Sequence, residues 1–275
     1  MVYQHTKLES WINPSQLCLY SLSKNLNAIH YFKSNPHMID LYWLSSNKNA
    51  IDLLKTKIYN VDWIALSANP SAIEYLKANP ERINWDNLSF NENAIEFLKE
   101  NPEKINWNLL SANPNAIDLL KENPELIRWN CLSANPNAID ILKENKEKIN
   151  WEILSSNPNA IEILKENPEK INWIYLSSNP NAIELLKANP EKIHWSNLST
   201  NPNAIEILQE NKNLIVYNKL SSNPAIFTYD YELIHKNFKD LGEEIIHKAL
   251  HPKRMLKLMQ EYGEDEIYKC YFDDD

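Results

Sequence analysis

Two histidines near the C-terminus have a spacing that can hold a metal ion. His247 and His251 lie four residues apart, which places two imidazoles on one face of a helix. A zinc site needs further ligands, and only His235 and Cys270 are candidates to supply them. No glutamate follows the first histidine, as it does in the metalloprotease motif. We therefore expect no metal site.

Serine could serve as a nucleophile, but Ser111 and its equivalents recur at one position of every unit of a repeat. A nucleophile is activated by one unsymmetrical set of neighbours, which a regular array does not offer. The chain has only two glycines, Gly242 and Gly263, whereas phosphate-binding loops and dinucleotide fingerprints depend on glycine. The sequence therefore predicts neither an enzyme nor a bound cofactor.

The elements that carry the recurring serines repeat with a period of 22 residues. Leucine occupies one position in ten copies, from Leu22 through Leu110 to Leu220. A strict period of this length indicates a repeat array, in which each unit buries its apolar face against its neighbours. Tryptophan marks seven of the units, at Trp63, Trp85, Trp107, Trp129, Trp151, Trp173 and Trp195.

Each repeat is predicted to hold two short helices. Residues 113–123 begin with Asn-Pro, a helix cap and first turn, and then place Ala, Ile and two Leu on one face. Asn123 precedes a proline and ends that helix. Asn106 caps a shorter helix that carries Trp107. The expected fold class is all-α, an α-solenoid of about ten 22-residue two-helix repeats with N- and C-terminal caps.

The irregular ends of the array suggest its boundaries. We expect an N-terminal cap in residues 1–20, helical repeats in 21–224 and an acidic helical C-terminal cap in 225–275. One residue of the repeat is missing after Pro224, and the 22-residue pattern ends there. Because stacked helices lie 8–10 Å apart, ten repeats would extend over about 80–100 Å.

A leucine-rich-repeat horseshoe is the main structural alternative, because it shares this range of repeat lengths and an asparagine ladder. It requires a strand with alternating Leu-x-Leu residues. In this chain Ile105 and Trp107 are two residues apart, but Leu110 follows Trp107 by three. The asparagine columns are interpreted as helix caps and turn residues. The alanine column that includes Ala138 is interpreted as a close helix contact where only a methyl group fits.

The charge distribution argues against a nucleic-acid partner. The net charge is −9, and residues 225–275 hold 12 acidic and 7 basic side chains, so more than half of the excess lies there. A nucleic-acid reader needs a basic stripe, and the central repeats are close to neutral. The chain shows no signal peptide and no apolar run of the roughly 20 residues that span a bilayer. Three well-separated cysteines fit a reducing compartment, so we expect a cytoplasmic protein without a membrane partner.

The unit Leu-Ser-x-Asn-Pro-Asn-Ala-Ile-x-Leu-Leu-Lys-x-Asn-Pro-Glu-Lys-Ile-x-Trp resembles short repeat proteins that large DNA viruses of amoebae encode in many copies. The segments 249–254 and 260–263 are similar to a closing segment of such proteins. The resemblance covers about residues 20–265 and implies a viral protein that acts in the host cytoplasm or in the virus particle. It brings no catalytic residues to transfer.

Positions that vary while the repeat frame stays fixed are candidates for partner binding. They lie one and five places after the tryptophan, four apart and therefore on one helix face. We expect a non-enzymatic scaffold that binds protein partners along this face. A purely structural component of the virus particle and a nucleic-acid-binding helical repeat are the alternatives. The candidate contact residues are Asp86, Phe90, Asn108, Glu152, Ile174 and Ser196.

Overall fold

A computed structural model describes residues 6–55, 61–236 and 250–263 of the chain. The chain divides after Thr228 into two compact units, and the 22-residue repeats all lie in the first of them. We call this first part the repeat unit. In the second unit the described residues include helix α21 (Pro252–Tyr262).

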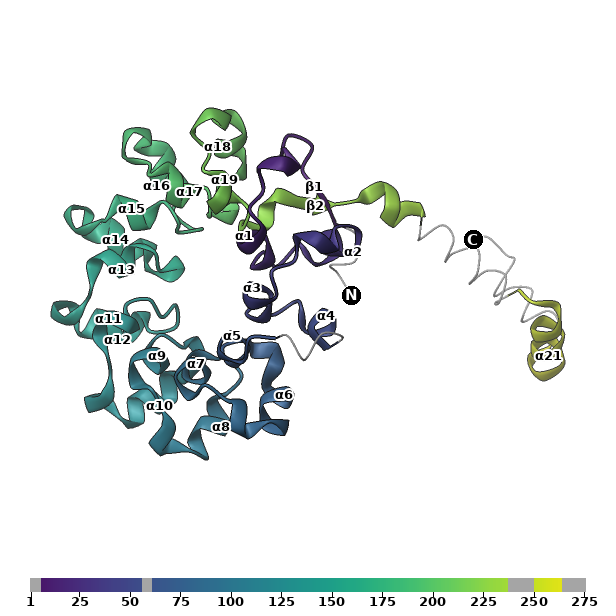
Figure 1. The fold of residues 1–275 in the computed structure, drawn as a ribbon, viewed down its shortest axis with the longest axis horizontal. Coiled ribbons are helices and arrows are strands. Elements are labelled where there is room, and N and C mark those ends of the chain that lie inside the picture. Colours follow the sequence, from purple (N-terminus) through teal and green to yellow (C-terminus); the bar gives the residue numbers. More distant parts are fainter. Residues whose placement is uncertain (1–5, 56–60, 237–249, 264–275) are drawn as a thin grey trace. The chain divides into compact units, whose positions relative to one another are not determined.

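The first helix of each repeat, which begins at the tryptophan position, lies in an inner row (Figure 1). Side-chain caps start several of these helices, as at α9, where Asn106 Oδ1 accepts hydrogen bonds from the N–H groups of Asn108 and Leu109. The inner helices are α1 (Leu19–Ser23), α3 (Leu41–Ser45), α5 (Trp63–Ser67), α7 (Trp85–Phe90), α9 (Trp107–Ser111), α11 (Trp129–Leu132), α13 (Trp151–Ser155), α15 (Trp173–Leu176), α17 (Trp195–Leu198) and α19 (Tyr217–Leu220).

The other helix of each repeat lies in an outer row (Figure 1). Asparagine ends these helices, as at α10, where Asn123 Nδ2 donates to the carbonyl of Leu119 at 2.9 Å. The asparagine column that includes Asn123 thus caps the C-termini of these helices. The outer helices in the described residues are α2 (Ile29–Ser34), α4 (Ile51–Lys55), α6 (Ile73–Ala78), α8 (Ile95–Lys99), α10 (Ile117–Glu122), α12 (Ile139–Glu144), α14 (Ile161–Glu166), α16 (Ile183–Ala188) and α18 (Ile205–Glu210).

Short 3-10 turns join the two rows and take up the Asn-Pro pairs. The turn at Pro114–Ala116 supplies the first part of the predicted helix over 113–123, and its continuation is α10. Proline suits the first position of such a turn because its missing N–H has no partner there. The turns are Pro14–Gln16, Pro36–Met38, Pro70–Ala72, Pro80–Arg82, Pro102–Lys104, Pro114–Ala116, Pro124–Leu126, Lys146–Lys148, Pro158–Ala160, Pro168–Lys170, Pro190–Lys192, Pro202–Ala204, Lys212–Leu214 and Pro224–Ile226.

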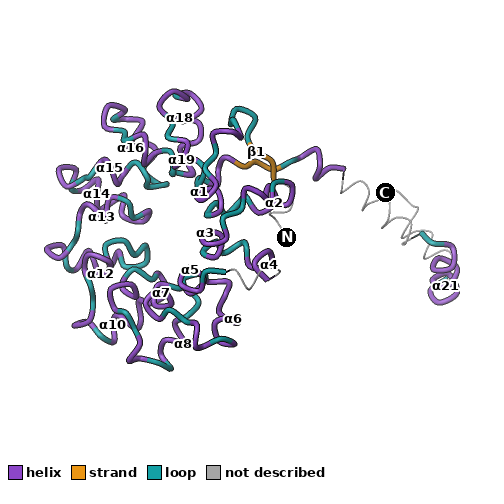
Figure 2. Tube along the Cα trace, in the orientation of Figure 1, coloured by secondary structure: helices purple, strands orange, loops and turns teal. Residues whose placement is uncertain are grey.

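The helical repeat array is confirmed, and the leucine-rich-repeat alternative is wrong. The repeat has helix on both sides, and the strands found in the described residues lie outside the repeated pattern (Figure 2). The leucine and alanine columns form the core between the rows. Ala138 has no exposed surface, as expected for a close helix contact, and the ten leucines from Leu22 to Leu220 are at most 2% exposed.

Buried asparagine and serine side chains join each repeat to the one before it. Asn113 Oδ1 accepts from the N–H of Asn115, while its Nδ2 donates to the carbonyls of Ser89 and Asn91 in the preceding repeat. Ser111 Oγ donates to the carbonyl of Trp107 and accepts from the N–H of Arg128 in the next repeat. The predicted cap role of the asparagines is confirmed, and the asparagine and serine side chains also bind neighbouring repeats together.

The first repeat forms these same bonds with the last one. Asn25 Nδ2 donates to the carbonyls of Ser221 and Asn223, at 3.0 and 2.7 Å. The N–H of Cys18 donates to Ser221 Oγ at 2.8 Å. The repeat unit therefore closes into a ring of ten repeats (Figures 1 and 2). We call the interface between α19 and α1 the seam.

The expectation of an elongated array of about 80–100 Å is therefore wrong for the repeat unit. Sequence periodicity specifies how one repeat contacts the next, but the curvature of an array depends on a small rotation per repeat. A full turn shared among ten interfaces, about 36° each, brings the last repeat onto the first. The boundaries 1–20, 21–224 and 225–275 stay predictions.

A two-stranded sheet strengthens the seam, in place of a tenth outer helix. Strand β1 (Thr6–Leu8) pairs with β2 (Phe227–Tyr229), which follows the last 3-10 turn. The N–H of Glu9 also donates to the carbonyl of Ile226 at 2.8 Å. The Phe227 ring lies 5.7 Å from that of Tyr31 on α2. Segments from both ends of the repeat unit thus hold the ring closed.

Candidate interaction surface on the inner helices

Each inner helix has a buried side and an exposed side. On α7, Leu88 and Ser89 are fully buried, whereas Asp86 and Phe90 are exposed. At 100° per residue, positions one, two and five after the tryptophan lie opposite the buried pair. The buried side packs on the outer row and on neighbouring inner helices, so the exposed side faces the middle of the ring. We call these three positions of all ten inner helices the inner surface.

The candidate contact residues all belong to this surface. Five of them are exposed, including Phe90 at 45% and Ile174 at 51%, while Ser196 is half-buried. Exposed apolar side chains indicate a binding surface when they form a contiguous patch. Asp86 and Asn108 come together in one open hollow of about 390 Å³, which Arg128 and Lys104 also line.

Asparagines of the following repeat hold several of these side chains in place. Asn106 Nδ2 donates to Asp86 Oδ1 at 2.8 Å, and Asn172 Nδ2 donates to Glu152 Oε1 at 3.4 Å. Both carboxylates keep unused acceptor capacity, because each has two oxygens. The acidic groups of the inner surface are therefore positioned and still accessible.

Four consecutive inner helices each present one large exposed apolar side chain. These are Tyr20 on α1, Tyr42 on α3, Ile64 on α5 and Phe90 on α7, with exposed fractions between 45% and 53%. We call these four residues the apolar arc. The first three lie one place after the tryptophan position of their repeats, whereas Phe90 lies five places after it. Only Phe90 was among the predicted contact residues. Tyr175, two places after Trp173, is also exposed and was not predicted.

In the column one place after the tryptophan position, the polar side chains begin with Asp86 on α7, and the next three inner helices also carry polar side chains there. Asn108 on α9, Asn130 on α11 and Glu152 on α13 are all exposed. We call these three residues the polar arc. Ile174 and Tyr175 on α15 then form a second, smaller apolar patch. The inner surface is thus uneven around the ring, even though the frame beneath it is regular.

The inner surface carries few charges, and they balance. Its charged side chains are Lys24, Lys219, Asp86 and Glu152. Lys24 Nζ lies 3.4 Å from the centre of the Trp43 ring. Burial and the neighbouring Lys219 both lower the pKa of the Lys24 ammonium. Two lysines against two carboxylates do not form the basic stripe that nucleic-acid phosphates require.

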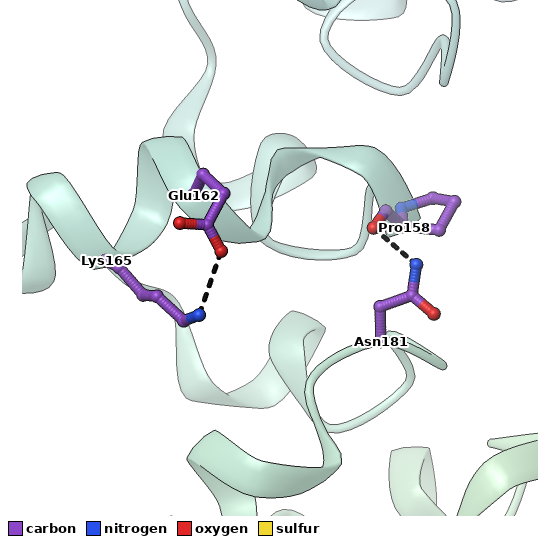
Figure 3. A network of polar contacts seen from close by, with 4 residues as sticks. All are labelled: Pro158, Glu162, Lys165 and Asn181. Atoms are coloured by element: carbon purple, nitrogen blue, oxygen red, sulfur yellow. Dashed lines mark hydrogen bonds and ion pairs between the residues drawn. The ribbon is translucent and has the colours of Figure 1, made fainter.

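The outer row has a different character, with ion pairs on successive helices. On α14, Lys165 Nζ lies 2.9 Å from Glu162 Oε1, and Asn181 Nδ2 binds the carbonyl of Pro158 across the repeat boundary (Figure 3). Equivalent pairs join Glu74 to Lys77 at 3.6 Å and Glu184 to Lys187 at 3.8 Å. Exposed pairs of this kind contribute little stability and keep the surface hydrated.

The tryptophan column packs on the core, and four of its seven rings lie beneath a cation. Each of the seven tryptophans is half-buried and packs against buried core residues. Lys148 Nζ lies 4.4 Å from the ring centre of Trp129, and Lys192 Nζ lies 4.5 Å from that of Trp173. The cation comes from the following repeat each time. The column therefore contributes to repeat contacts through cation–π pairs.

The residues that could hold a metal are only partly described. His251 is exposed, and His247 lies outside the described residues. Among residues 6–55, 61–236 and 250–263, no three His, Cys, Asp or Glu side chains gather as metal ligands. Within the same ranges, every helix is too short or too polar to cross a bilayer.

A comparison with known proteins finds no family model, no curated protein and no solved structure that matches this chain. Its functional interpretation therefore depends on the geometry of the repeat unit.

Proposed function

We propose that this chain is a non-enzymatic helical-repeat scaffold that binds a protein partner on the inner surface. The apolar arc carries the proposal: Tyr20, Tyr42, Ile64 and Phe90 expose large side chains on four neighbouring helices. Contiguous exposed apolar groups with polar neighbours are typical of protein-binding surfaces. The rigid ring holds them in fixed positions, which lowers the entropy lost on binding.

The resemblance to repeats encoded by large DNA viruses of amoebae supports a setting in the host cytoplasm or the virus particle. A partner of either origin would meet the same surface. The balanced charge of the inner surface favours a protein over a nucleic acid.

Site-specific photo-crosslinking in infected amoebae tests this proposal. A photo-reactive amino acid replaces Asn108 on α9, and the control carries it at the exposed Glu184 on α16 in the outer row. We expect one discrete adduct from position 108 and none of that mass from position 184. Adding Phe90→Asp should abolish the adduct, because a charge would be buried in the contact.

Equal labelling from both positions, or no adduct from position 108, would contradict binding on the inner surface. An adduct with a particle protein, found in purified virus, would favour the structural alternative over a host-directed scaffold. Cross-linking to nucleic acid from position 108 would favour the alternative of a nucleic-acid-binding helical repeat.

A further inference from the structure

The space enclosed by the inner helices suits one further helix. Neighbouring inner helices pack against each other, as α5 does against α7. Ten helices spaced about 8–10 Å apart give a circle of axes about 28 Å across. Subtracting one helix radius of about 5 Å on each side leaves an opening of about 18 Å. The half-exposed side chains of the apolar arc show that this middle region is accessible to solvent.

The shape of the apolar arc matches a cylinder better than an extended strand. Its four residues come from four adjacent helices, α1, α3, α5 and α7, which together form a concave wall. An α-helix with its side chains is about 10–12 Å wide and can contact such a wall with one side. A single strand would leave its backbone N–H and C=O groups unpaired against these apolar side chains, whereas a helix pairs its own.

The chemistry around the arc specifies an amphipathic helix. The apolar stripe of such a helix is at least about 100° wide, enough to meet several helices of the arc. A helix seated there leaves about 6–8 Å on its far side, room for water and for the polar arc of Asn108, Asn130 and Glu152. The rest of the ligand therefore faces mostly polar side chains, with Ile174 and Tyr175 on α15 as the exception.

We propose that the apolar arc binds one amphipathic α-helix of a partner protein, seated inside the ring of inner helices. This inference rests on the proposed function and names its partner class. Helix-in-groove recognition uses anchors at i, i+3, i+4 and i+7. Tyr20, Tyr42, Ile64 and Phe90 surround such anchors from successive directions.

Fluorescence anisotropy with the full chain tests this inference. The probe is a labelled peptide of about 20 residues, built from Leu, Ala, Gln and Ser with its leucines at helical spacing. A second peptide has the same composition in scrambled order. We expect saturable one-to-one binding of the first peptide, and at least about tenfold weaker binding of the scrambled one.

Two matched variants locate the binding. Ile64→Asp should weaken binding of the helical peptide at least about tenfold, because it places a charge in the apolar contact. Leu214→Asp makes the same kind of change at an exposed leucine of a 3-10 turn outside the inner row, and should change affinity less than twofold. Circular dichroism of both variants checks that they are folded.

Three results would overturn the inference: no binding of the helical peptide, equal binding of the scrambled peptide, or unchanged affinity in Ile64→Asp. If the adduct from position 108 persists in any of these cases, only the helical nature of the partner is wrong. If the adduct is also missing, the proposed function fails with it.

Discussion

The seam and an interior interface use the same bonds but differ in chain continuity. Between the repeats of α9 and α11, Asn135 Nδ2 donates to the carbonyls of Ser111 and Asn113 at 3.1 and 2.8 Å. At the seam, Asn25 Nδ2 donates to two carbonyls of the last repeat at 3.0 and 2.7 Å. The interior repeats are consecutive in the chain, whereas the two at the seam are brought together only by closure.

The difference lies in what surrounds these shared bonds. The seam adds the β1–β2 pair and the contact between Tyr31 and Phe227, where interior repeats continue into an outer helix. Closing a long loop costs chain entropy, which the extra contacts offset. The repeated residues therefore specify an interface, while residues at the two ends specify that the array closes.

The largest expected effect on stability comes from removing a buried asparagine, either at the seam or at an interior interface. Asn25→Ala and Asn135→Ala should each lower the free energy of unfolding by about 2–4 kcal/mol, because each removes three hydrogen bonds from a fully buried site. Urea unfolding measures both. Asn137→Ala, at an exposed position, should cost under about 1 kcal/mol. An unchanged stability in Asn25→Ala would mean that the seam is open.

The alanine column should be nearly as sensitive. Ala28→Leu in the first repeat and Ala138→Leu in the interior should each cost about 1–3 kcal/mol, because both alanines are fully buried between helices. Asp140→Leu adds similar bulk at an exposed position of α12 and should cost much less. Melting temperatures compare the three variants. Equal values for Ala138→Leu and Asp140→Leu would show that the column does not lie at the helix contact.

Removing β1 should loosen the seam alone. In a chain that begins at Ser10, we expect the N–H of Cys18 to exchange with deuterium about tenfold faster, a change of about 1.4 kcal/mol. This N–H donates to Ser221 Oγ across the seam. The N–H of Arg128 makes the equivalent bond to Ser111 inside the array and should keep its rate. Equal acceleration at both sites would mean that β1 stabilises the whole ring.

The smallest effect should come from the cations over the tryptophans. Lys148→Ala removes an ammonium 4.4 Å from the Trp129 ring and should cost about 0.5–1 kcal/mol. Lys170→Ala alters the same position of the neighbouring repeat, where the described structure shows no such pair, and should cost less. Thermal unfolding of both variants provides the comparison, and a larger loss in Lys170→Ala would contradict the assignment.

The repeat frame was predictable because each of its residues has a local physical role. The caps, the buried leucines and the small alanines follow from spacing and helix chemistry. Closure of the ring was not predictable, since the rotation between repeats depends on packing details that the 22-residue pattern does not contain. In the site, Phe90 and Ile174 were identified as variable apolar residues. Tyr20 lies in the predicted N-terminal cap, and Tyr42 and Ile64 lie in the first repeats, before the units from which the contact positions were predicted.

The shared inner surface depends on ring closure. Closure can be tested directly by measuring the distance between two nitroxide spin labels with double electron–electron resonance. Nitroxide labels at Lys33→Cys on α2 and Gln209→Cys on α18 occupy exposed positions two repeats apart across the seam. The three native cysteines, Cys18, Cys131 and Cys270, are replaced by serine. A closed ring predicts one narrow distance distribution centred at about 20–30 Å. A distribution centred at about 65–80 Å, the length of eight stacked repeats, would contradict closure.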